Sequence, residues 1–260
     1  MSRSRLVRFG MGLGPLALLL VLWTLWADRL AGGMGVLFPT PAEVGSRLRT
    51  AWSAKLGFDI LQTFGTTLIG FLSGLAGALV VGLALGSSRW ADMLFFGWIH
   101  AFRSLPVALY VPIALVLLGP GPKLPVVLAA FVTLLYGSLP IYQAVKDYDP
   151  EKILLLKGRG FKKLNILARF ILPEAFTALL MTASITITLS LAVTVVTEML
   201  FQGIGGLGAR VISAKEASDY AGLWLYTIML GLGGYLYFVG MKKTLHLFAP
   251  WTRRVADRND

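Results

Sequence analysis

Two charged side chains, Arg103 and Glu198, lie within long apolar runs of the 260-residue sequence. A charge inside a membrane span is costly, so such residues are by default candidates for a functional role. Arg103 falls roughly 16 Å into the third predicted span at 1.5 Å per residue. As a pathway or gate residue, a cation at this depth would favour the passage of an anion. In the structural alternative, Arg103 hydrogen-bonds the carbonyls freed by Pro106 or reaches the inner headgroups.

Glu198 lies near the outer end of the fifth predicted span. Two roles fit this position equally well. Glu198 is either an interfacial carboxylate with access to water or a carboxylate that contacts solute or a second subunit. Because the two charges fall at different depths, we do not expect Glu198 to pair with Arg103. Both residues are candidates for the pathway or its gate.

The sequence gives little support for nucleotide binding, metal binding or catalysis by this chain. Gly203-Ile-Gly205-Gly-Leu-Gly208 matches the pattern GxGxxG, but it follows an apolar helix rather than a strand, which favours a flexible outer turn over a dinucleotide site. No nucleotide-binding P-loop pattern occurs, so ATP would have to be bound by another chain. With no cysteine and with His100 and His246 far apart, we expect no metal site, no catalytic residue and no cofactor on this chain.

The stretch Pro150–Pro173 is strongly basic and lies between two apolar runs. Apolar residues from Phe161 to Ile171 recur at helical spacing, so one face of the stretch should be buried against another apolar surface. Gly158 and Gly160 predict that a first short helix ends before a second begins, and Pro173 predicts the first turn of the next span. The pattern indicates either a docking element for another protein or an ordinary amphipathic surface segment. Its cations are Lys152, Lys157, Arg159, Lys162, Lys163 and Arg169.

Composition places these elements in a membrane protein. Hydrophobic residues make up 56% of the chain and charged residues 14%, and the mean hydropathy is +0.73, whereas soluble domains carry about 25% charged residues. We therefore predict an all-α, polytopic transmembrane helical bundle of about six spans. The net charge of +11 lies mainly in loops and tails, which indicates contact with lipid headgroups rather than nucleic acid. The predicted spans are Leu13–Ala27, Asp59–Gly86, Asp92–Leu118, Leu124–Val145, Pro173–Leu200 and Tyr220–Leu245.

Several spans carry further signals. The first resembles a signal peptide but lacks a small-residue cleavage site, so we interpret it as an uncleaved span. Thr40 should cap a short interfacial helix that starts at Pro41. Glycines on one face of the second span predict close packing against another helix, and Pro106 and Pro112 should break the third. The segment Phe201–Asp219 is predicted to be an outer loop.

The distribution of cations orients the chain. Sixteen Lys and Arg residues lie in segments 1–12, 87–91, 146–172 and 242–260, against seven in the alternate segments. Both termini are therefore predicted to be cytoplasmic. The expected organisation is a basic N-terminus at 1–12, a transmembrane domain at 13–245 with a cytoplasmic loop at 147–172, and a basic tail at 246–260.

The cytoplasmic loop resembles the coupling loop of ABC-importer membrane subunits. The family motif is Glu-Ala-Ala, three residues, Gly, nine residues, Ile, one residue, Leu-Pro. Gly160 and Leu172–Pro173 stand at the family's spacing, whereas Leu154–Leu156 replace Glu-Ala-Ala and Phe170 replaces the Ile. The resemblance implies contact with an ATPase subunit through Glu151, Leu154, Leu155, Leu156, Lys157, Gly160, Phe161 and Lys162.

Three more segments extend the resemblance from about residue 37 to 220. The segment Leu37–Val44, the run Arg103–Pro106 followed by Val111-Pro112, and Thr197–Met199 with Gly206–Gly208 are similar to permeases for nitrate, sulfonates, taurine, bicarbonate and thiamine precursors. Four matching segments in the same order carry more weight than any one of them. The resemblance implies the type I ABC importer fold.

The function implied by the resemblance is that of a permease subunit in the bacterial inner membrane. It implies a dimer of identical chains, two ATPase subunits that bind ATP and Mg²⁺, and an external binding protein that delivers a small anion such as a sulfonate, nitrate or bicarbonate. A secondary carrier driven by an ion gradient is the first alternative, although no internal repeat is visible. A membrane-embedded enzyme is the second, although no catalytic set is present.

Overall fold

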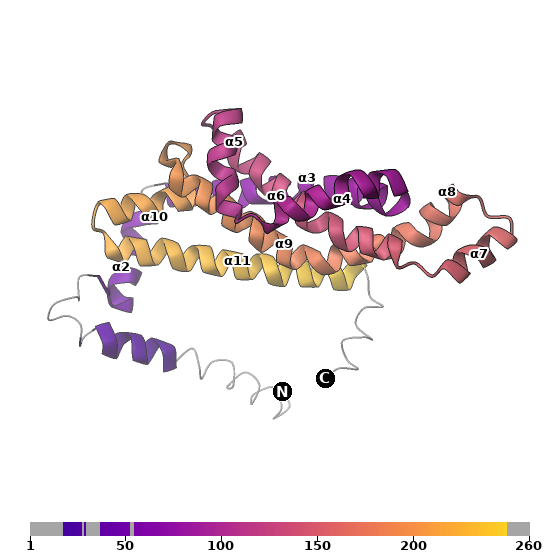
Figure 1. Cartoon of the computed structure of the whole chain (residues 1–260). Coiled ribbons are helices and arrows are strands. Elements are labelled where there is room, and N and C mark those ends of the chain that lie inside the picture. Colours follow the sequence, from indigo (N-terminus) through magenta and orange to yellow (C-terminus); the bar gives the residue numbers. More distant parts are fainter. Residues whose placement is uncertain (1–17, 28, 30–36, 53–54, 249–260) are drawn as a thin grey trace, which may run out of the picture.

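The computed structural model describes residues 18–27, 29, 37–52 and 55–248. In this part of the chain every secondary-structure element is a helix, and the long helices lie side by side along one axis (Figure 1). The predicted basic N-terminus and most of the predicted basic tail lie outside the described residues. Of the predicted first span, residues 18–27 are described, and they form a helix.

Four helical segments are long and apolar enough to cross a membrane, and they agree with four predicted spans. They contain α3 (Leu56–Ser87), α6 (Lys123–Lys146), α9 (Leu172–Leu200) and α11 (Tyr220–Phe248). α6 packs between α3 and α9, and α11 packs mainly on α9. The described residues therefore form a polytopic bundle of four spans, or five if the bent pair that follows α3 is one span.

The interface between α3 and α6 depends on glycine. A Cβ added at Gly74 would lie 2.4 Å from the carbonyl oxygen of Ala130, and one at Gly82 would lie 2.6 Å from the Cβ of Ile141. Gly70 and Gly86 approach α6 as closely. The predicted small-residue face is therefore confirmed, and it allows the two backbones to meet where lipid provides no hydrophobic force between helices.

The predicted third span is not a single helix. Its two halves, α4 (Arg89–Ser104) and η1–α5 (Val107–Leu109 and Tyr110–Leu118), are bent by 99° across Pro106. The predicted break at Pro106 is confirmed, but a second break at Pro112 is wrong. Pro112 is the third residue of α5, where the backbone N–H has no partner within the helix and its loss costs little.

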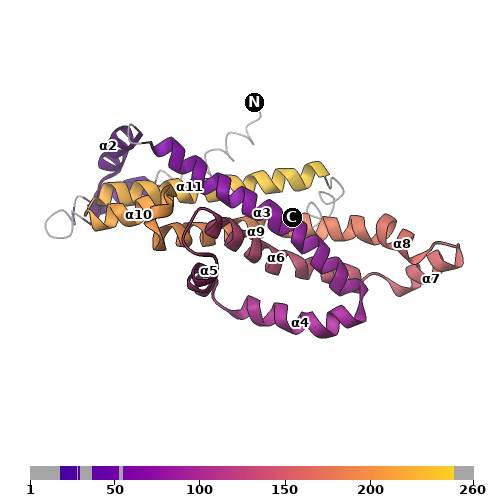
Figure 2. The ribbon, with the colours of Figure 1, turned by 90° about the horizontal axis from the view of Figure 1, so that it is seen from above.

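Opposite ends of the bundle carry different short elements (Figures 1 and 2). At one end, α7 (Pro150–Gly158) and α8 (Lys163–Ile166) extend beyond the long helices. At the other lie α2 (Pro41–Trp52) and α10 (Gly206–Glu216). α2 starts at Pro41 as predicted, where the Thr40 Oγ1 accepts from the Glu43 amide at 3.3 Å and the Glu43 Oε2 accepts from the Thr40 amide at 2.7 Å, a reciprocal cap.

Candidate functional site

The hairpin of α7 and α8 starts and turns at residues suited to those positions. Asp149 caps α7 by accepting a hydrogen bond from the Glu151 amide at 2.9 Å, and Pro150 occupies the first turn. Gly160 has a φ of +84°, in the left-handed region that favours glycine. The predicted helix end at Gly158–Gly160 is confirmed. The Asp149 cap was missed, although Asp-Pro-Glu is a typical helix start.

The predicted coupling residues divide between two faces of the hairpin. Leu154 and Leu155 are 73% and 68% exposed. Leu156 and Phe161 instead pack against a buried cluster formed by α3, α6, α9 and the second half of the hairpin, and Phe161 meets Phe170 edge to face at 5.6 Å. The first pair is therefore free to meet another protein, while the second fixes the hairpin to the bundle. Glu151, Lys157, Gly160 and Lys162 are exposed.

The second half of the hairpin differs from the prediction of a separate short helix. α8 continues through a π-helical segment, η2 (Leu167–Ile171), directly into α9. Pro173 has no N–H to donate to the carbonyl of Arg169 in an α-helical pattern, and the wider π turn ends just before it. Pro173 does lie in the first turn of α9, as predicted. One continuous helical segment, Lys163–Leu200, thus joins the hairpin to a span.

Arg103 lies in the last turn of α4, before the bend. Its guanidinium carbon is 4.7 Å from the centroid of the Tyr136 ring on α6, a cation–π contact. The Tyr136 hydroxyl donates to the Arg103 carbonyl at 3.2 Å, so this tyrosine contacts both the side chain and the backbone. The Arg103 Nε is buried without a hydrogen-bond partner. The sequence did not identify Tyr136 as a partner of Arg103, because no local pattern links two residues that are thirty-three positions apart.

Glu198 is buried near the C-terminal end of α9, with a relative exposure of 1%. Its Oε2 accepts hydrogen bonds from the Thr63 hydroxyl at 2.9 Å and the Gly208 amide at 3.0 Å, while Oε1 has no partner. The Thr63 hydroxyl in turn accepts from the Leu207 amide at 2.8 Å. One carboxylate therefore connects α3, α9 and the first turn of α10.

The predicted outer loop is largely the helix α10, and the expectation of a simple turn was incomplete. Glycines in the stretch Gly203–Gly208 bring the chain onto Glu198: Gly205 and Gly206 have φ of +83° and +90°, and Gly206 has no room for a Cβ. Asp59 on α3 accepts from the Gly206 amide at 3.3 Å and pairs with Arg210. α10 is therefore attached to α3 through hydrogen bonds and an ion pair.

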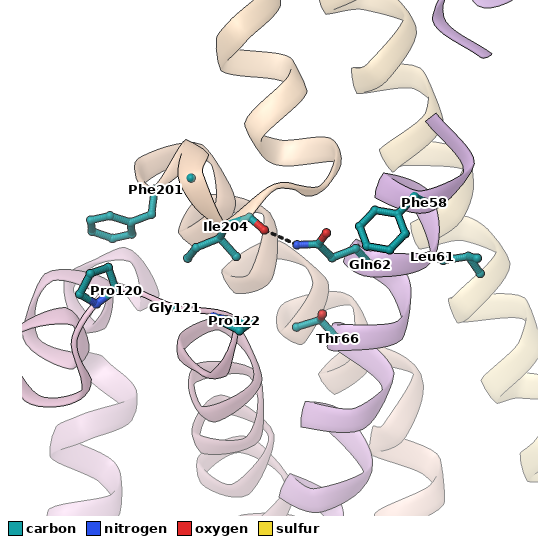
Figure 3. A pocket seen from close by; sticks show the side chains of 10 residues that line it. Phe58, Leu61, Gln62, Thr66, Pro120, Gly121, Pro122, Phe201 and Ile204 are labelled. Atoms are coloured by element: carbon teal, nitrogen blue, oxygen red, sulfur yellow. Dashed lines mark hydrogen bonds between the residues drawn. The ribbon is translucent and has the colours of Figure 1, made fainter. Parts of the chain in front are cut away.

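A cavity of about 850 Å³ lies at this same end (Figure 3). It is bounded by α3, by the turn between α5 and α6, and by η3 (Gln202–Ile204). All the described residues that line it are uncharged, and Gln62 and Thr66 are its polar side chains. Gln62 donates to the carbonyl of Ile204. Neither Arg103 nor Glu198 lines this cavity, and the described residues show no ion pair between the two.

Known proteins resemble the chain along most of its length. Residues 74–243 match the family described as binding-protein-dependent transport system inner membrane component. The chain is 30% identical over 235 residues to a probable ABC transporter permease of Brucella melitensis, covering 89% of this chain and 92% of that protein. It is 24% identical over 236 residues to the nitrate import permease NrtB of Synechocystis sp., covering 85% and 82%. A chain of the inward-facing MetNI methionine ABC transporter shares the fold, with a TM-score of 0.64, 18% identity and coverage of 76% and 98%.

Proposed function

Because the chain belongs to the family of binding-protein-dependent transport system inner membrane components, we propose that it forms the pathway of an importer for a small anion. In this proposal two identical chains line the pathway, and two ATPase subunits bind beneath them. An external binding protein delivers the solute. ATP and Mg²⁺ would be bound by the ATPase subunits, and the residues of this chain would transmit the movement.

The exposed pair Leu154 and Leu155 is the observation that carries the proposed contact with the ATPase. The two leucines, 73% and 68% exposed, lie on an element that extends beyond the long helices (Figure 1). An apolar pair on such an element is stabilised when a partner covers it. Since leucines replace the acidic start of the family motif, we propose that docking depends mainly on apolar burial.

The continuous helix from α8 into α9 supports a route for coupling. A displacement of α7 would reach α9 through the Phe161–Phe170 contact and η2, because α8, η2 and α9 form one continuous helical segment. At the far end of α9, Glu198 holds the start of α10. We propose that closure of the ATPases tilts α9 and moves α10 with it, so that the outer end opens as the inner end closes.

The proposed orientation places α7 inside and α10 outside. Lys and Arg are concentrated in the segments assigned to the cytoplasm, and α7 and α10 lie at opposite ends of the bundle (Figure 2). A reporter fused after Tyr148 should be cytoplasmic, and one fused after Ser213 should be external. Reporters on the same side would contradict this topology.

The proposed solute is an anion because Arg103 places a cation in the α4–α5 segment and because a relative is a nitrate permease. The test is uptake by proteoliposomes that contain the complete transporter, with nitrate, a sulfonate and bicarbonate offered separately and urea as a neutral control. We expect uptake of at least one anion that requires both ATP and the binding protein, and none of urea. Uptake driven by an ion gradient without ATP would contradict the proposal and favour a secondary carrier.

A further inference from the structure

A second cavity, of about 690 Å³, lies between the α7–α8 hairpin and the ends of two spans. Ser87 at the end of α3 and Val145 near the end of α6 contribute the side toward the spans. Ile153 of α7 and Leu167 of η2 contribute the side toward the hairpin. The cavity therefore lies at the end of the bundle where α3 and α6 meet the hairpin, and most of its lining is apolar.

Among the described residues that line this cavity, every charged side chain is a lysine. Lys157 lies on α7, and Lys162 and Lys163 lie where α8 begins. All three are exposed, and the described lining contains no carboxylate. Three ammonium groups above an apolar floor complement a ligand that has an anionic head and a hydrocarbon tail.

The residues of α7 that line the cavity are not the exposed leucines. Ile153 and Lys157 are four residues apart and share one face, and both line the cavity. Leu154 and Leu155 do not line it and remain exposed. A subunit that contacts only Leu154 and Leu155 would therefore leave the cavity uncovered.

We propose that this cavity binds one anionic phospholipid, with its phosphate between Lys157, Lys162 and Lys163 and an acyl chain against Val145 and Leu167. The lipid would fill the space between the hairpin and the spans and so support the hairpin. This inference uses only the membrane location of the bundle and does not depend on the solute or on the ATPase.

Native mass spectrometry of the purified full chain in detergent tests the proposal, with phosphatidylglycerol and phosphatidylcholine of identical acyl chains as probes. The test variant is Lys157→Gln/Lys162→Gln/Lys163→Gln. The matched control is Lys152→Gln/Arg159→Gln/Arg169→Gln, which removes the same charge from the same stretch at positions that do not line the cavity. Elution on size exclusion shows whether each variant remains folded.

We expect the wild-type chain to retain phosphatidylglycerol in preference to phosphatidylcholine. The test variant should bind it about a hundredfold more weakly, at about fivefold per lysine, and the control within about threefold of wild type. Ser87→Leu, which fills the apolar part and removes no charge, should also weaken retention. Equal losses in the two triple variants would overturn the proposal in favour of a diffuse basic surface. An unaffected Ser87→Leu, or displacement of the lipid by millimolar inorganic phosphate, would overturn it in favour of a phosphate site that needs no acyl chain.

Discussion

The carboxylate of Glu198 accepts a hydrogen bond from the Gly208 amide at 3.0 Å, so the end of α9 holds the first turn of the helix that follows it. The polypeptide turns back on itself between these two residues. The partial positive charge at the start of α10 offsets part of the cost of burying a carboxylate. The end of the bundle that carries α10 is thereby fixed to the span that continues from the α7–α8 hairpin.

The Thr63 hydroxyl is the second support of this arrangement. Thr63→Ala removes one hydrogen bond to Glu198 and leaves the Leu207 amide without a partner. Leaving buried groups unsatisfied costs about 1–3 kcal/mol, so the melting temperature of the purified chain should fall. Thr67→Ala is the matched control, because Thr67 is equally buried and its hydroxyl donates to the Thr63 carbonyl of the same helix. Equal melting temperatures for the two variants would show that the Thr63–Glu198 bond contributes no stability.

The close approach at Gly206 gives an independent test of the position of α10. In Gly206→Ala the new Cβ would lie 2.4 Å from the Glu198 carboxylate, at a φ of +90°, and we expect a cost of about 1–3 kcal/mol from the backbone alone. Gly203→Ala is the control, because no atom lies within 4 Å of its added Cβ. Uptake and melting temperature should fall in Gly206→Ala and remain near wild type in Gly203→Ala. Two variants with unchanged melting temperatures would contradict the described turn.

The long helices could be predicted because each leaves a signal within its own residues. An apolar run long enough to span a membrane predicts each of the helices α3, α6, α9 and α11. Thr40 with Pro41 predicts the start of α2. The bend at Pro106 is equally local. The break expected at Pro112 was wrong because the effect of a proline depends on its distance from the helix start.

The candidate site was predicted less well because its contacts join distant residues. Glu198 could be singled out as a charge within a span, but the bond to Thr63 crosses 135 positions. The contact between Arg103 and Tyr136 likewise crosses from one helix to another. The helical periodicity begins at Phe161 and does not include Leu154–Leu156, so it did not separate the exposed Leu154 and Leu155 from Leu156, which packs against a buried cluster.

Arg103 remains a predicted pathway residue, and its contact with Tyr136 sharpens the test. Arg103→Lys keeps the charge and the cation–π attraction, so part of the uptake should remain, whereas Arg103→Gln loses both and should abolish most uptake. Tyr136→Phe is the control, since it keeps the ring and loses only the hydrogen bond to the Arg103 carbonyl. Uptake in proteoliposomes and melting temperature are measured together. If Lys and Gln variants lose uptake equally and in proportion to stability, Arg103 braces the bend instead.

The most direct test of the account is the association of the chain with the ATPase subunit of its own transporter in Leu155→Asp. Burial of one leucine contributes about 1.5–3 kcal/mol, so affinity should fall about tenfold to hundredfold, with loss of ATPase stimulation and normal membrane insertion. Asn165→Asp, which adds the same charge at an exposed position of α8, should bind and stimulate like wild type. Co-purification of the ATPase at the wild-type ratio with Leu155→Asp, together with normal stimulation, would contradict the proposed docking face.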